Sequence, residues 1–196
     1  MSLDRLCDHK AIRTTLAQLM SASILVVSGS LRKGSFNSHL ARQAVARAPH
    51  GVTACLSDAP RGLPYYDGDL DTDSPPSEVA AWRESIAQSS ALLFVTPTYN
   101  HALPGGLKNA LDWASRPFGA HCLIGKRVAV LGCSPGTSGS KQGVAYLRTI
   151  LPFLGMTLVG EEVALPQIAD KVNLETGWVN DDIDALLRET MRLLAE

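Results

Sequence analysis

The sequence predicts a three-layer α/β sandwich, in which a parallel β-sheet lies between two layers of helices. Short apolar runs of strand length alternate with segments of helical periodicity along most of the 196 residues, which is the pattern of repeated β-α units. Runs such as Ile24-Leu25-Val26-Val27 and 91–95 are apolar at every position, as strands buried on both faces are. Because β-α-β crossovers are right-handed, we expect the sheet to be doubly wound.

Five strands are expected, because five short runs rich in apolar and β-branched residues are bounded by glycine, proline or polar residues. The expected strands cover 24–29, 51–56, 91–96, 127–132 and a last segment that starts at 157.

Helical periodicity and capping residues place the helices between and after these strands. A turn-rich stretch from Asp58 to Pro76 precedes the second helix, and Pro75-Pro76 supplies the prolines that favour a helix start. The last helix is expected to be capped by Asn180 or Asp181. The expected helices cover 36–48, 76–89, a short helix within 97–115, 140–153 and 180–194.

The chain is expected to form one domain over residues 23–196, preceded by an N-terminal extension of residues 1–22. Leucine and isoleucine recur at roughly helical spacing between residues 3 and 20, so this extension is predicted to be helical or partly disordered. Charged residues from Asp4 to Arg13 interrupt any apolar core, so we do not expect this segment to be a signal peptide. No apolar run reaches the length of about 18 residues that a transmembrane helix needs.

Charge and cysteine content limit the binding partners and the cellular compartment that we expect for this protein. Lys and Arg total 18 against 19 Asp and Glu, a net charge of −1, which argues against nucleic acid or an anionic membrane as the main partner. The cysteines at 7, 55, 122 and 133 are scattered, with no C-x-x-C pair and no histidines at zinc spacing. We therefore expect reduced cysteines, no metal site and a cytoplasmic protein.

The most informative segment runs from Gly29 to Asn37 and joins the first strand to the first helix. A helix that follows a strand directs its free N–H groups and the positive end of its dipole at one point. Hydroxyl and amide side chains add donors, and Arg32 adds a fixed positive charge. The loop matches neither the Walker A motif nor the G-x-G-x-x-G fingerprint. It is therefore predicted to bind a monophosphate, the alternative being an ordinary turn with a capped helix.

Two further loops leave the carboxyl ends of neighbouring strands, where doubly wound sheets bind their ligands. Residues 97–104 place Tyr99 between prolines and glycines, so that the ring can form a wall for a flat ligand. Asn100 is expected either to bond that ligand or to fix the turn. Residues 133–139 supply small side chains and backbone donors on the other side.

The segments Gly29–Asn37 and Pro97–Trp113 resemble the NAD(P)H-dependent FMN reductase family, whose members include quinone, azo-dye and chromate reductases. The resemblance covers most of residues 23–160. It implies a flavodoxin-like, FMN-binding domain with strand order 2-1-3-4-5, and NADPH or NADH as co-substrate. It also implies a homodimer or homotetramer, to which the apolar segment 103–113 contributes. The FMN-binding residues that follow from the motifs are Ser30, Leu31, Arg32, Ser35, Phe36, Asn37, Pro97, Thr98, Tyr99, Asn100, Ser134 and Gly136.

One position departs from the family pattern. Many relatives have Glu where Thr98 stands. Because the main chain is expected to contact the flavin there, binding should survive the change, while the flavin potential and the preferred acceptor are in question.

The resemblance implies a flavoenzyme that passes a hydride from NAD(P)H through FMN to a quinone, azo compound, flavin or metal oxyanion, with ping-pong kinetics. The protein then orients and tunes the cofactor, and no residue is expected to act as a catalytic acid or base. His101 is expected to be an exposed loop histidine, and Cys133 an inert thiol. The alternatives are a flavodoxin-type FMN electron carrier without nicotinamide turnover, and a non-enzymatic sensor of a phosphate ligand.

Overall fold

A computed structural model describes residues 22–196. Nearly all of the expected N-terminal extension, with Cys7, lies outside the described residues. The strands are β1 (Ser23–Ser28), β2 (Thr53–Ser57), β3 (Ala91–Val95), β4 (Arg127–Cys133), β5 (Thr157–Leu158) and β6 (Val163–Leu165). The helices are α2 (Phe36–Val45), α3 (Ala59–Gly62), α4 (Ser77–Ala87), α5 (Gly105–Ala114), α6 (Lys141–Phe153) and α7 (Asp181–Ala195), with 3-10 turns η1 (Gly68–Leu70) and η2 (Ile168–Asp170).

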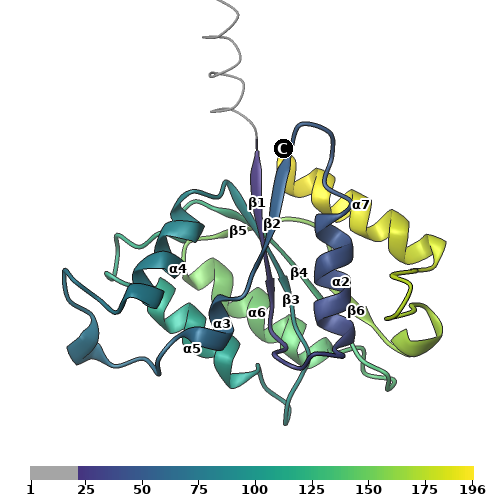
Figure 1. Ribbon diagram of the computed structural model, residues 1–196, viewed down its shortest axis with the longest axis horizontal. Coiled ribbons are helices and arrows are strands. Elements are labelled where there is room, and N and C mark those ends of the chain that lie inside the picture. Colours follow the sequence, from purple (N-terminus) through teal and green to yellow (C-terminus); the bar gives the residue numbers. More distant parts are fainter. Residues whose placement is uncertain (1–21) are drawn as a thin grey trace, which may run out of the picture.

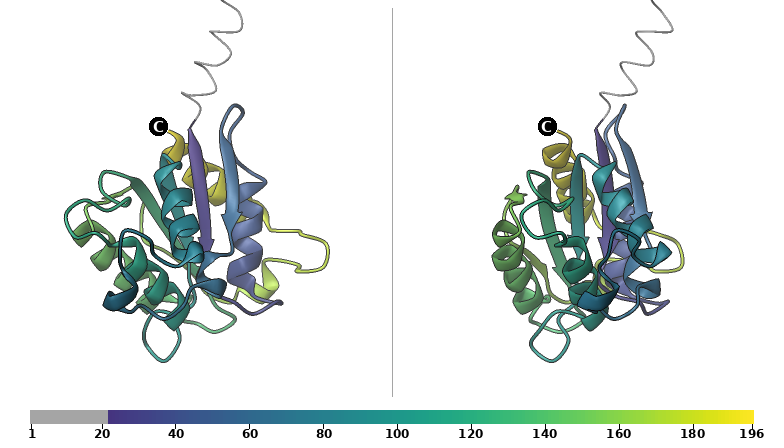
Figure 2. Two further views of the ribbon diagram at one scale, coloured as in Figure 1. Left: turned by 60° about the vertical axis from the view of Figure 1, so that its left-hand side comes forward. Right: turned by 90° about the vertical axis from the view of Figure 1, so that its left-hand side faces the viewer.

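All strand pairs of the sheet are parallel, in the order β2-β1-β3-β4-β5, and β6 also pairs with β4. Helices α2 and α7 cover one face, and α4, α5 and α6 cover the other (Figure 1 and Figure 2). The predicted fold class and strand order are therefore confirmed.

Alternate residues of each central strand supply the two halves of the core. In β1, Ile24 and Val26 face α2 and α7, whereas Leu25 and Val27 face the opposite helical layer. Every residue of β3 is buried, which explains why its sequence is apolar throughout rather than alternating. Strand β2 has partly exposed side chains because it lies at the edge of the sheet.

The fifth strand begins at Thr157, as expected, but the structure divides this last segment of the sheet into two short strands. β5 pairs with β4 only at Arg127 and Val128, and β6 resumes the pairing at Leu131 to Cys133. The segment between them contains Gly160 at φ +71°, a left-handed conformation that interrupts an extended strand. The sheet therefore has six strands rather than the five predicted.

Other element boundaries shift by a few residues. The first helix ends at Val45 instead of 48, with Ala46 as its C-cap. The last helix begins at Asp181, and the Asn180 side chain accepts a hydrogen bond from the Ile183 N–H, which confirms Asn180 as the cap.

The turn-rich stretch after β2 is attached to α5. The Asn109 side chain accepts a bond from the Tyr66 N–H (2.7 Å) and donates to the Pro64 carbonyl (2.8 Å), which also accepts a bond from the Trp113 indole (2.8 Å). These polar residues of α5 thus hold a loop. Within the described range, no helix has the length and apolar character needed to cross a bilayer.

Candidate functional site

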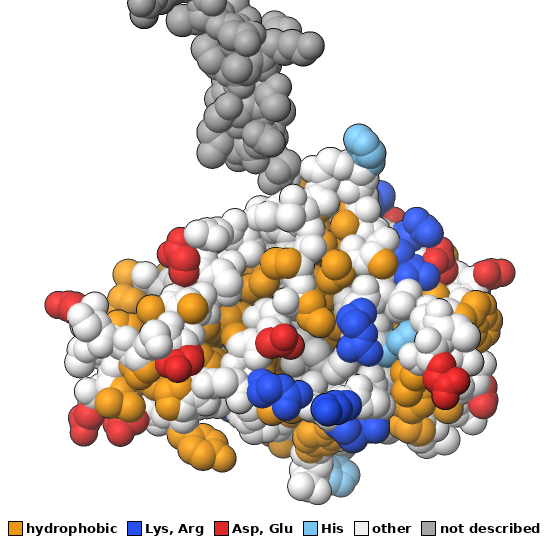
Figure 3. All heavy atoms as spheres, in the orientation of Figure 1, with side chains coloured by type: hydrophobic (Ala, Val, Ile, Leu, Met, Phe, Trp, Pro, Cys, Tyr) orange, Lys and Arg blue, Asp and Glu red, His pale blue; other side chains and the backbone are white. Residues whose placement is uncertain are grey.

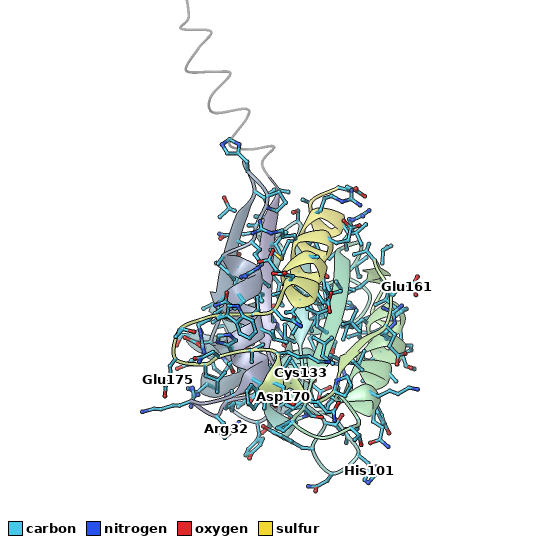
Figure 4. The ribbon with its side chains drawn as sticks, turned by 90° about the vertical axis from the view of Figure 1, so that its right-hand side faces the viewer. Arg32, His101, Cys133, Glu161, Asp170 and Glu175 are labelled. Carbon is cyan, nitrogen blue, oxygen red and sulfur yellow. The ribbon has the colours of Figure 1, made fainter. Side chains whose placement is uncertain are left out.

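Three loops converge where β1, β3 and β4 end, and together they enclose a cavity of about 180 Å³. In Figure 4, Arg32, Cys133 and His101 all lie at this end of the molecule. We call this space the loop cavity. Its lining consists of Ser30, Arg32, Ser35, Phe36, Asn37, Pro97, Thr98, Tyr99, Cys133, Ser134, Pro135 and Ser140.

The N-terminus of α2 gives one end of the loop cavity an anion-binding character. Ser35 caps the helix by accepting a hydrogen bond from the Ser38 N–H (3.3 Å). Among the described residues, the N–H groups of Phe36 and Asn37 find no acceptor, and the first turn holds no acidic side chain. With Arg32 beside it, this helix end presents free donors and positive charge to the cavity.

Buried hydroxyls fix the shape of the loop between β1 and α2. The hydroxyl oxygens of Ser28 and Ser38 are 2.9 Å apart. Each hydroxyl also donates a hydrogen bond to the Ser30 carbonyl, at 3.2 Å from Ser28 and 3.0 Å from Ser38. These hydroxyls face the interior of the loop and hold the Ser30 backbone. Ser28 and Ser38 were not among the predicted site residues, since a serine at a strand end or in a first helical turn has no distinctive signal.

Asn37 connects the first loop to the third. Its side chain donates to the Cys133 carbonyl (3.0 Å) and accepts from the Cys133 N–H (3.1 Å). The same carbonyl accepts a bond from the Ser140 hydroxyl (2.8 Å). Asn37 is buried, so its amide works as a structural link, and only its backbone N–H is free for a ligand.

The loop after β3 forms a tight hairpin. Tyr99 and Ala102 exchange both backbone hydrogen bonds at 3.0 Å, and the two residues between them, Asn100 and His101, have φ of 49° and 63°. Asn is well suited to this left-handed conformation. Of the two alternatives for Asn100, the structure supports the fixing of the turn. The Tyr99 hydroxyl lies 3.2 Å from the Ser30 hydroxyl, so the ring leans across the cavity toward the first loop.

Thr98 ties the hairpin to α6. Its hydroxyl accepts a hydrogen bond from the Gly143 N–H (2.8 Å), in the first turn of that helix. The formal N-cap, Ser140, has φ +68° and makes no cap bond with its side chain, because its hydroxyl bonds Cys133 instead. Thr98 therefore caps α6 from a different loop.

The loop after β4 is supported by the segment that follows β6. The Ser134 N–H donates to the Leu165 carbonyl (3.1 Å), and the Ser134 carbonyl accepts from Ile168 (3.2 Å). The Gly136 carbonyl accepts from Gln167 (3.0 Å). Because β6 was not predicted, the hydrogen bonds that hold the loop after β4 were not predicted either.

Nine of the twelve residues expected to bind the ligand line the loop cavity. The other three do not: Asn100 lies in the hairpin turn, Gly136 faces open space, and Leu31 lines a second hollow on the far side of the loop. Cys133, Pro135 and Ser140 line the cavity without having been predicted to do so. Contact with a ligand stays a prediction for all of these residues.

Comparison with known proteins identifies the family. The model of the NADPH-dependent FMN reductase family matches residues 22–170. The chain belongs to this family. It is accordingly an oxidoreductase and a flavoprotein, with FMN as the cofactor and NAD(P)H as the reductant of its family.

The relatives cover most of the chain. A 2-hydroxy-1,4-benzoquinone reductase from a Burkholderia species is 38% identical over 174 residues, which cover 88% of this chain and 93% of the relative. A quinone reductase from Escherichia coli is 39% identical over 166 residues, covering 83% and 88%. Among solved structures, the flavoenzyme NAD(P)H:(acceptor) oxidoreductase FerB from Paracoccus denitrificans aligns with a TM-score of 0.78 and 32% identity, covering 88% of this chain and 97% of FerB.

The donor set of the loop cavity fits the FMN of this family. A phosphate needs N–H and hydroxyl donors with positive charge, and α2 offers two free N–H groups beside Ser30, Ser35 and Arg32. A planar ring needs flat, mostly apolar walls, which Tyr99, Pro97 and Pro135 supply.

The titratable groups near the cavity do not form an acid–base pair. Burial raises the pKa of the Cys133 thiol to about 12, so Cys133 stays protonated at neutral pH. His101 lies exposed on the hairpin turn, and Figure 4 shows it well away from Arg32. Across residues 22–196, no three His, Cys, Asp or Glu side chains are grouped to hold a metal ion.

Proposed function

We propose that the protein is an FMN-dependent NAD(P)H oxidoreductase that reduces small acceptors such as quinones, azo compounds, free flavins or metal oxyanions. The observation that supports it most is the continuity of the loop cavity. One end presents the free N–H groups of α2 and Arg32, and the other end is walled by Tyr99 and Pro97.

Each loop has a distinct part in this proposal. Ser30, Arg32, Ser35 and the N–H groups of Phe36 and Asn37 hold the phosphate. The backbone of residues 97–100 borders the isoalloxazine ring, and Ser134 and Gly136 approach it from the side of β4. Bound FMN would supply hydride-transfer chemistry between the nicotinamide and an acceptor, and one shared site for both would give ping-pong kinetics.

In this proposal the chain positions the cofactor and sets its environment, and no side chain transfers a proton. The Asn37 amide and the Thr98 hydroxyl join the three loops through hydrogen bonds of 2.8 to 3.1 Å, which preorganises the cavity. The buried, protonated Cys133 keeps charge away from the end of β4. Hydride transfer needs no acid or base from the protein, in keeping with the residues that line the cavity.

An anaerobic titration tests this function. Purified protein reconstituted with FMN is expected to show flavin absorbance, to bleach when NADPH or NADH is added alone, and to recover its colour when a quinone follows. Initial rates at varied nicotinamide and quinone are expected to give parallel reciprocal plots.

Two outcomes would contradict the proposal in different ways. Flavin that binds but is not reduced by either nicotinamide would indicate the flavodoxin-type electron carrier. A protein that binds inorganic phosphate but not FMN would indicate a phosphate-ligand sensor.

The proposal extends to assembly and compartment. Tyr146 and Phe153, one heptad apart on α6, are exposed to 53% and 80%, which is unusual for large apolar side chains on one helix face of a monomer. A homodimer or homotetramer that covers α6 is the assembly they support. The near-neutral charge and scattered cysteines support a cytoplasmic location.

A further inference from the structure

A second hollow adjoins the loop cavity on the other side of the first loop. Its volume is about 110 Å³, and it lies between the Ser30–Lys33 segment, the face of α2 that carries Ser38 and Arg42, and the end of β2 with the segment that follows it. Four cationic side chains line it, together with hydroxyls and a single carboxylate. The charged residues of this hollow are Arg32, Lys33, Arg42, Arg61 and Asp58.

The positive charge of this hollow is not neutralised by neighbouring carboxylates. Within the described part of the chain, none of the four cations has a carboxylate oxygen within ion-pair distance, although seven other ion pairs form elsewhere. With Asp58 included, the lining has a net charge of +3. Figure 3 shows a group of blue side chains over the ends of β2 and α2, with a red, acidic side chain beside it.

The walls of the hollow are held in place by contacts that need no ligand. Arg61 donates to the Leu31 carbonyl and so joins the segment after β2 to the first loop. The Ser57 hydroxyl accepts from the Ala59 N–H (3.2 Å), and Pro60 is buried. The cations are therefore carried by a defined concavity rather than scattered over an open surface.

The charge exceeds what the FMN phosphate needs. The α2 N-terminus, Arg32 and two free N–H groups already face the loop cavity, and they suffice for one phosphate. Ser30 and Arg32 line both spaces, whereas Lys33, Arg42 and Arg61 line only the second hollow. A second anionic group close to the first is the ligand that this surplus charge favours.

We propose that the second hollow binds the 2′-phosphate of NADPH and makes the enzyme prefer NADPH to NADH. This inference rests on the proposed function, because the nicotinamide has to reach the loop cavity next door. The 2′-phosphate is a compact dianion that NADPH has and NADH lacks, which suits a small hollow with converging cations. The pyrophosphate is larger, and because both nucleotides contain it, binding it would not distinguish NADPH from NADH.

The variant Arg42→Gln tests the subsite, since Arg42 lies outside the loop cavity and makes no side-chain hydrogen bond with a described residue. Loss of a charged hydrogen bond is expected to lower kcat/KM for NADPH about ten- to hundred-fold, with a much smaller effect for NADH. The control is Arg188→Gln, an exposed arginine of α7 paired with Asp184, which is expected to leave both values unchanged.

A binding measurement gives a readout that does not depend on turnover. By calorimetry, the FMN-loaded protein is expected to bind 2′,5′-ADP more tightly than 5′-AMP, and added KCl is expected to reduce the difference. Arg42→Gln is expected to abolish the difference, and Arg188→Gln to preserve it.

The outcomes separate this inference from the proposed function. Equal affinity for 2′,5′-ADP and 5′-AMP, or a ratio that Arg42→Gln does not change, would overturn the subsite even where NADH bleaches the flavin. A loss of FMN affinity in Arg42→Gln as large as the loss for NADPH would assign the hollow to FMN and overturn it as well. Failure of both nicotinamides to reduce bound FMN would instead refute the proposed function.

Discussion

At the residue scale, we expect flavin retention to depend on Arg32. It lines the loop cavity beside the free N–H groups of α2. We expect Arg32→Ala to weaken FMN binding by about 1.5–3 kcal/mol, the range for a hydrogen bond to a charged group. Titration of FMN fluorescence against the apoprotein measures this, with Lys33→Ala as the neighbouring control. FMN affinity that is unchanged in Arg32→Ala would remove Arg32 from the phosphate site.

Asn37 is expected to matter for stability before it matters for binding. Removal of its amide in Asn37→Ala leaves the buried Cys133 N–H without its acceptor at 3.1 Å. An unsatisfied buried group costs about 1–3 kcal/mol, so the free energy of unfolding in urea should fall by that amount. Ser134→Ala, whose hydroxyl bonds only the nearby Gly136 carbonyl at 3.3 Å, is the control and should lose much less. Similar losses in both variants would refute the linking role.

Cys133 and Cys55 are expected to react very differently with an alkylating agent. Cys55 is exposed on the edge strand, whereas burial raises the pKa of Cys133 from its ordinary value of 9.0 to about 12. At pH 8, peptide mapping after iodoacetamide treatment should show labelled Cys55 and unlabelled Cys133. Rapid labelling of native Cys133 would show that this thiol is accessible and ionised.

The same shift in the pKa of Cys133 has a consequence for stability at alkaline pH. Below about pH 9 both the folded and the unfolded chain keep the proton, so Cys133 adds no pH dependence there. Between about 9 and 12 the unfolded chain releases the proton while the folded chain retains it. Since the folded state then binds more protons, the contribution of Cys133 to the free energy of unfolding decreases as pH rises through this window.

At the element scale, α6 depends on a cap supplied by another loop. Thr98→Val removes the acceptor of the Gly143 N–H and should destabilise the protein by about 0.5–2 kcal/mol, the range measured for helix caps. Thr98→Ser keeps the hydroxyl and should restore most of the loss, as measured by urea unfolding. If Val and Ser variants were equally stable, the 2.8 Å bond would have no capping role.

The elements show where reasoning from sequence succeeds and where it stops. Apolar strands such as Ala91–Val95 were predictable because burial on both faces leaves a local, uninterrupted pattern. Strand β6 was not predictable from the sequence. Its three residues are half-buried, and their extended conformation depends mainly on pairing with β4. At the site, the loops followed from the strand ends, but the partners of Asn37 and Thr98 did not. Each bonds a residue at least 45 positions away, and nothing in the local sequence specifies such a contact.

At the scale of the whole molecule, the surface available for assembly is on α6 rather than on the apolar segment 103–113 that the sequence suggested. The apolar residues of α5, including Leu107, Leu111 and Trp113, are buried in the chain's own core and are not free for a partner. Instead, α6 places Tyr146, Ile150 and Phe153 at helical spacing. Tyr146 and Ile150 line a hollow of about 200 Å³ together with Leu103 and Lys108.

The double variant Tyr146→Asp with Phe153→Asp tests whether this face joins two copies. Both side chains are more than half exposed, so their replacement should leave the protomer folded, while two buried carboxylates would disfavour the interface. Light scattering at micromolar concentration is expected to show a dimer or tetramer for the natural chain and a smaller species for the variant. Trp178→Asp, at an aromatic that is 53% exposed in the segment between η2 and α7, is the matched control and should not change the mass. A monomeric natural chain, or a variant of unchanged mass, would refute an interface on α6, since apolar area of this kind stabilises association only when it is removed from water.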